Sequence, residues 1–215
     1  MNLGAYQDIL SGECTIPVHP VVAHLGPGAE QDYFELYRKA CTKAYERKGD
    51  IAFEHSRESA AIHEAGHVVL CKLDDFGVAW ARIWRDKEHK SAWCGWTEGI
   101  GEDMQLGTAA TPESNLRGAR QIMAGYISER VFEGEDAREG SSVDERAACM
   151  FPIVWAARAL GRNPMDVLKA TEEQLTGMLE RNTDTAQAIA KALIKATPMK
   201  LKGAKLNSLV AKVHL

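Results

Sequence analysis

One pentapeptide, His63-Glu64-Ala65-Gly66-His67, constrains this chain more than any other feature. It lies in an apolar run typical of a helix, and residues four apart on a helix stack on one face. His63 and His67 can therefore direct two imidazoles at one point beside the helix, which is half of a tetrahedral zinc site. Glu64 follows the first histidine, in the position of a general base for metal-assisted hydrolysis.

The alternative is a pair of core histidines satisfied by neighbouring groups. With 7 His in 215 residues, the pattern arises by chance in about two such chains in a hundred. The flanking residues are apolar, however, and three polar groups in a buried helix are costly without partners. We therefore interpret this stretch as a core helix with a metal site, and we expect Zn²⁺ as the cofactor.

The composition is that of an ordinary globular protein, with 45% hydrophobic and 26% charged residues. A net charge of −4 gives no reason to expect nucleic acid as a partner. The five cysteines include no C-x-x-C pair, which favours reduced thiols in a cytoplasm. We expect no membrane span and no signal peptide, because no apolar run is long enough and the first residues lack a basic start.

The patterns along the chain predict a mainly α fold with a small β-hairpin, an α+β class. We expect an N-terminal arm and helix over residues 1–55, packed as one domain with a zinc peptidase domain over residues 56–215. Ser56 is a plausible helix cap, and alternating residues predict paired strands. The further predicted elements are a helix to about residue 73, strands at 78–85 and 92–97, and helices at 112–133, from 142 onward, at 165–181, 183–197 and 206–213.

A catalytic zinc needs a third protein ligand and an open position. The metzincin pattern is excluded, because Leu70 and Leu73 stand where it requires glycine and histidine. A carboxylate from elsewhere in the chain is the remaining solution. The residues themselves leave four candidates open, which are Glu88, Glu98, Glu129 and Asp144.

Four stretches, in order, resemble the peptidase domain of the FtsH family of zinc proteases. They are Ser56-Arg57 leading into Ile62-His-Glu-Ala-Gly-His-Val68, Cys94-Gly-Trp-Thr97, Met123-Ala-Gly-Tyr-Ile-Ser-Glu-Arg-Val-Phe-Glu-Gly134 and Gly140-Ser-Ser-Val-Asp-Glu-Arg-Ala147. The resemblance covers about residues 56–213. It implies an FtsH-like peptidase fold in which His63, His67 and Asp144 bind zinc and Glu64 is the base.

The chain departs from this family in two positions and lacks one motif. Val143 replaces the family's Asn beside the aspartate, and Tyr126 replaces its Arg. No G-x-x-x-x-G-K-[ST] phosphate loop occurs, so the ATPase module of FtsH is not expected here. The sequence thus predicts a free-standing peptidase domain that acts on its own or with a separate unfoldase; an oligomer is compatible with the resemblance but demanded by no residue.

The leading hypothesis is a zinc-dependent endopeptidase that cleaves unfolded or flexible polypeptides. The strand around Cys94, Gly95, Trp96 and Thr97 is expected to hold the substrate by strand addition. Trp93 and Trp96 are equally compatible with core packing and with the wall of a peptide groove. Two other hypotheses are a catalytically silent FtsH-like zinc module that acts through partner binding, and a zinc hydrolase for small amides.

Overall fold

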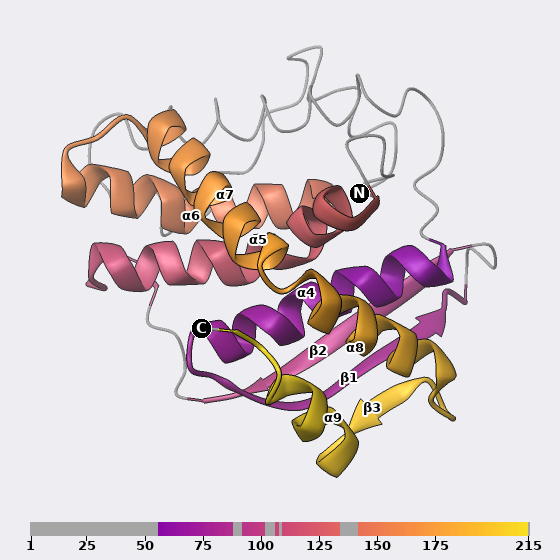
Figure 1. Cartoon of the computed structure of the whole chain (residues 1–215). Helices are drawn as coiled ribbons and strands as arrows, with labels where there is room; N and C mark the ends of the chain where they lie inside the picture. The colour runs from indigo at the N-terminus through magenta and orange to yellow at the C-terminus, as the bar shows by residue number, and fades with distance from the viewer. Residues whose placement is uncertain (1–55, 88–91, 102–105, 108, 134–141, 215) are drawn as a thin grey trace. The chain divides into compact units, whose positions relative to one another are not determined.

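The computed structural model describes residues 56–87, 92–101, 106–107, 109–133 and 142–214 (Figure 1). The predicted arm and helix over residues 1–55 lie outside these ranges. The described residues are mainly helical with a three-stranded antiparallel sheet, which confirms the predicted fold class. Within these ranges, no helix has the combination of length and hydropathy that crossing a membrane requires.

The chain divides into two compact units that alternate along the sequence. The described part of the first unit comprises residues 106–107, 109–123 and 142–172. The described part of the second comprises 56–87, 92–101, 124–133 and 173–214. Two helices, α5 and α7, therefore begin in the first unit and end in the second. The predicted boundary at residue 55 stays a prediction.

The first unit consists of helices. It contains the start of α5 (Pro112–Glu133), all of α6 (Ser142–Leu160) and the start of α7 (Pro164–Glu180). Thr111 caps α5, because its Oγ1 accepts a hydrogen bond of 3.1 Å from the Ser114 backbone N–H. Apolar side chains that α5, α6 and α7 bury in this unit are Ala119, Met123, Met150, Ile153, Val154 and Val167.

The second unit is a helix layer on one face of a sheet. Helix α4 (Arg57–Leu73) packs on strands β1 (Gly77–Arg85) and β2 (Trp93–Ile100), and α8 (Thr183–Lys195) packs on α4 (Figure 1). β1 and β2 form the predicted hairpin. Ser56 caps α4, accepting a hydrogen bond of 2.9 Å from the Ser59 backbone N–H. The capped helix places the pentapeptide in the core, as its apolar flanks predict.

The sheet has one strand that the sequence analysis missed. β3 (Lys200–Lys202) pairs with β1, so the strand order is β2-β1-β3. Local patterns did not predict this strand, because three residues are too few to show an alternating pattern. α9 (Gly203–Val210) follows directly and begins three residues earlier than predicted. β2 is consequently an edge strand among the strands that the structure describes.

Alternation along the strands separates the core from the solvent side of the sheet. Ala81 and Ile83 on β1 and Leu201 on β3 are buried on the face that α4 covers. Burial of a large apolar side chain of this kind stabilises a fold by about 1.5–3 kcal/mol. The other buried apolar side chains of the second unit include Val68, Val69, Leu70, Ile127, Leu175, Leu179, Ile189 and Leu193.

Candidate metal centre

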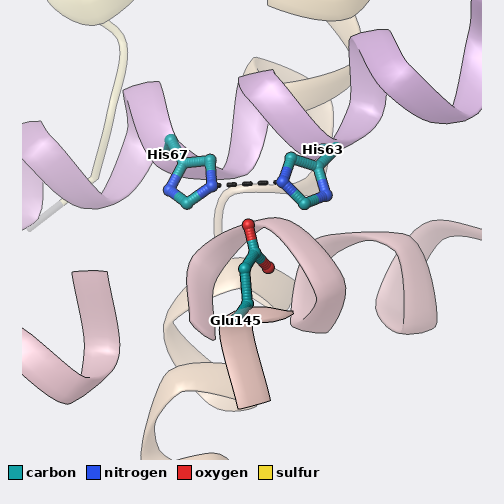
Figure 2. A group of neighbouring side chains, drawn as sticks. All are labelled: His63, His67 and Glu145. Carbon is teal, nitrogen blue, oxygen red and sulfur yellow. Dashed lines mark hydrogen bonds between the residues drawn. The ribbon is translucent and has the colours of Figure 1, made fainter. Parts of the chain in front are cut away.

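The two histidines of the pentapeptide direct the same ring nitrogen at each other. Nε2 of His63 lies 3.3 Å from Nε2 of His67, as the dashed line in Figure 2 shows. Two ligands at about 2.0–2.1 Å from a tetrahedral zinc ion are about 3.3–3.4 Å apart. The observed separation therefore fits two adjacent ligands of one zinc ion.

A buried carboxylate holds the His63 ring from its other nitrogen. Oε1 of Glu129 lies 2.6 Å from Nδ1 of His63, and the Glu129 side chain has 0% of its surface exposed. A carboxylate in this position accepts the Nδ1 proton, which leaves the Nε2 lone pair available to a metal. Glu129 was one of the candidate third ligands, but its contact is with the nitrogen on the other side of the ring.

Small residues allow α4 and the second half of α5 to approach closely enough for this contact. A Cβ atom on Gly66 would lie 2.5 Å from the Cβ of Ser128, and a Cβ on Gly125 would overlap the His63 ring. Ser128 also donates a hydrogen bond of 2.8 Å to the Ile62 carbonyl oxygen. Glycine at positions 66 and 125 is thus a steric requirement of the histidine site.

Glu64 lies against the edge strand β2. Its side chain is buried, with 3% of the residue exposed. Thr97 Oγ1 donates a hydrogen bond of 2.6 Å to Glu64 Oε2. A Cβ on Gly95 would overlap the Glu64 side chain, so the carboxyl group packs directly on the β2 backbone. The proposed base therefore lies at the strand that was predicted to hold substrate.

The four predicted substrate-binding residues divide between two faces of β2. Gly95 and Thr97 face Glu64, so Cys94 and Trp96 face the other way by the two-residue period of a strand. Trp96 is 57% exposed, and its Nε1 donates a hydrogen bond of 2.8 Å to Glu98 Oε2. Glu98 shares that outer face, which places it on the wrong side of β2 to join the two histidines.

The surroundings of Cys94 on the outer face of β2 raise the pKa of its thiol. Its Sγ donates a hydrogen bond of 3.4 Å to Asp86 Oδ2. Desolvation by burial is the main cause that raises the pKa of the Cys94 thiol to about 11. The hydrogen bond to Asp86 and the charge of Asp86 raise this pKa further, by smaller amounts. This thiol is therefore protonated near neutral pH, and a protonated thiol is a poor nucleophile.

The structure does not describe the side chains of two of the candidate ligands. Asp144 lies on α6 in the first unit, and its side chain is outside the described residues, as is all of Glu88. Figure 2 draws Glu145, the residue after Asp144, with the two histidines of the second unit. The identity of the third ligand stays a prediction.

Sequence analysis considered Glu129 only as a candidate third ligand and gave Gly125 no role. The available signal was their spacing, because residues 125 and 129 share one face of α5 and both meet His63.

Tyr126, which departs from the FtsH pattern, is fully buried. No protein-family model matches this chain, and no curated protein matches it.

Proposed function

We propose that this chain is a zinc-dependent endopeptidase that hydrolyses peptide bonds in unfolded or flexible polypeptides. The observation that supports this most is the pair of Nε2 atoms of His63 and His67, 3.3 Å apart on one helix face. The contact of Glu129 with the far nitrogen of His63 adds to it, because metal-binding histidines are usually oriented by such a carboxylate. Imidazole donors at this spacing suit zinc.

The ligand set of the proposal is His63, His67 and a carboxylate from α6. The resemblance to the FtsH family assigns that position to Asp144, and Glu145 is the neighbouring alternative on the same helix. When bound, zinc supplies Lewis acidity, which polarises a peptide carbonyl and activates water near neutral pH. Glu129 keeps the His63 ring in the tautomer that can ligate.

Glu64 is the proposed general base. Its carboxylate takes a proton from the attacking water and later returns that proton to the leaving amine. The buried setting supports this assignment. Glu64 is 3% exposed and forms no ion pair with a described residue, and a merely structural histidine site has little use for such a carboxylate. Gly95 and Thr97 place it beside the edge strand.

An extended peptide is the proposed substrate because β2 is an edge strand among those described. Strand addition uses backbone hydrogen bonds, so it selects for extended conformation more than for sequence. Folded proteins would then need a separate unfoldase as partner. Cys94 is a free thiol, which supports the proposal of a reducing compartment such as the cytoplasm.

The test is cleavage of a permanently unfolded protein by the zinc-loaded full chain, with Glu64→Gln measured in parallel. We expect cleavage by the wild type, loss of cleavage in Glu64→Gln with zinc still bound at one per chain, and loss of zinc in His67→Ala. Zinc binding without Glu64-dependent cleavage would instead favour the silent module that acts through partner binding.

The same assay identifies the third ligand. Asp144→Asn and Glu145→Gln alter neighbouring carboxyl groups on α6 by the same isosteric change. The proposal expects Asp144→Asn to release zinc and Glu145→Gln to retain it. The reverse result would move the assignment to Glu145 without affecting the two histidines.

A further inference from the structure

We propose that Thr97 is a positioning residue for Glu64, holding the carboxylate of the general base in the orientation in which it works. This inference rests on the proposed peptidase function and deepens it. Sequence analysis placed Thr97 in a substrate-binding strand, and the structure shows a different contact for its hydroxyl group. That contact is with the proposed base.

The single hydroxyl proton of Thr97 has two acceptors within reach, and both belong to Glu64. Thr97 Oγ1 lies 2.6 Å from Glu64 Oε2 and 3.3 Å from the Glu64 backbone oxygen. The shorter bond has the length of a hydroxyl donating to a charged carboxylate, which is the stronger kind of hydrogen bond. Among the described residues, Thr97 is the one hydrogen-bond donor to the Glu64 carboxylate.

The surroundings leave the carboxylate few alternatives. The Glu64 side chain lies so close to Gly95 that a Cβ there would overlap its Cγ and Oε1 atoms. The β2 backbone therefore limits the side chain on one side, and Thr97 holds one carboxylate oxygen. The second oxygen, Oε1, forms no hydrogen bond with a described residue, so in the proposed reaction it is the oxygen available to accept a proton from water.

A general base must be within hydrogen-bond reach of the proton that it removes. A glutamate has three rotatable bonds, and displacement of a catalytic group by about 1 Å can cost about 100-fold in rate. Loss of the Thr97 hydroxyl should therefore reduce the chemical step. Substrate binding to the β2 backbone should be affected much less, because those backbone groups are unchanged.

The kinetic test compares Thr97→Val, which keeps the side-chain shape, with Thr97→Ser, which keeps the hydroxyl. We expect kcat to fall about 10- to 100-fold in Thr97→Val with KM changed by less than about twofold, and Thr97→Ser to recover most of kcat. Thr171→Val is the matched control, since that buried hydroxyl donates to Val167 O within α7. In a Glu64→Gln background, Thr97→Val should cause no further loss.

A second measurement does not depend on activity. In the metal-free protein, we expect the shifts of the urea midpoint for Thr97→Val and Glu64→Gln to be non-additive in the double variant, because the two residues are in direct contact. Additive shifts would overturn the inference. A Thr97→Val enzyme with the kcat of the wild type would also overturn it, while leaving the peptidase function intact.

Failure of the proposed function has a separate signature. In that case the wild type itself shows no Glu64-dependent cleavage. The positioning role of Thr97 is then refuted together with the peptidase function, even if the urea midpoints show that Thr97 and Glu64 are coupled. The comparison of wild type, Glu64→Gln and Thr97→Val therefore assigns each negative result to one of the two proposals.

Discussion

Oε1 of Glu129 lies 2.6 Å from Nδ1 of His63, and Glu129 has no exposed side-chain surface. The two residues are 66 positions apart in the sequence and come from different helices, α5 and α4. A buried carboxylate requires a partner, because an unpaired buried charge is strongly destabilising. The contact therefore serves the fold and, in the proposed enzyme, the orientation of a zinc ligand.

Replacing Glu129 with glutamine should weaken zinc binding while leaving the fold intact. Glutamine keeps an acceptor for the Nδ1 proton but loses the negative charge that strengthens the histidine as a ligand. We expect about 10- to 100-fold lower zinc affinity, measured by competition with a chromophoric chelator. Glu113→Gln, at an exposed position on the same helix, is the control and should bind as the wild type does. Equal affinities in both variants would contradict an orienting role for Glu129.

Gly125→Ala should damage the histidine site directly. A Cβ at this position overlaps the ring of His63, which is held by Glu129 and cannot simply rotate away. We expect a marked loss of zinc affinity by the same competition assay, together with a lower unfolding midpoint. Gly177→Ala is the matched control, because its Cβ would approach no atom closer than 3.5 Å. That helical control should be stabilised by about 0.5–1 kcal/mol.

Gly95→Ala should separate zinc binding from catalysis. The added methyl group overlaps the Glu64 side chain and must displace the proposed base, and its three nearest atoms all belong to Glu64. Cleavage of an unfolded protein should fall about 100-fold or more with zinc affinity unchanged. Gly99→Ala lies on the same strand and face, with its nearest neighbours 3.8 Å away, and should remain active. Equal activity of the two variants would argue against Glu64 as the base.

The Cys94 thiol should be slow to alkylate near neutral pH. The pKa of this thiol is raised from 9.0 to about 11, so about one thiol in a thousand is ionised at pH 8. The alkylation rate should therefore keep rising with pH up to about 11, as followed by mass spectrometry of the Cys94 peptide.

Asp86→Asn tests the cause of this slow reaction. Asp86 contributes to the raised pKa through its hydrogen bond and its charge, so the substitution should lower the pKa and accelerate alkylation at pH 8. An unchanged rate would mean that desolvation by burial, the largest cause, acts alone. Thr97→Ser, which lies on the other face of β2, should leave the alkylation rate unchanged.

Local patterns predicted the elements that build the site. The Ser56 cap, the apolar flanks of the pentapeptide and the alternating hairpin strands are encoded in neighbouring residues, and the structure confirms all three. β3 was missed because pairing of three residues with β1 depends on a partner more than a hundred residues away. Thr97 was predicted only as part of a substrate-binding strand. Its contact with Glu64 was missed, because that hydrogen bond joins two elements that no local pattern connects.

The sequence by itself determined that His63 and His67 face the same side of one helix, because helical geometry depends only on local spacing. It also determined which residue types are available as base and ligands. Only the tertiary structure decided their positions: it placed Glu129 behind His63, Glu98 on the outer face of β2, and Thr97 on the carboxylate of Glu64. These assignments depend on the packing of α4 against α5 and β2, where glycines at positions 66, 95 and 125 permit close approach.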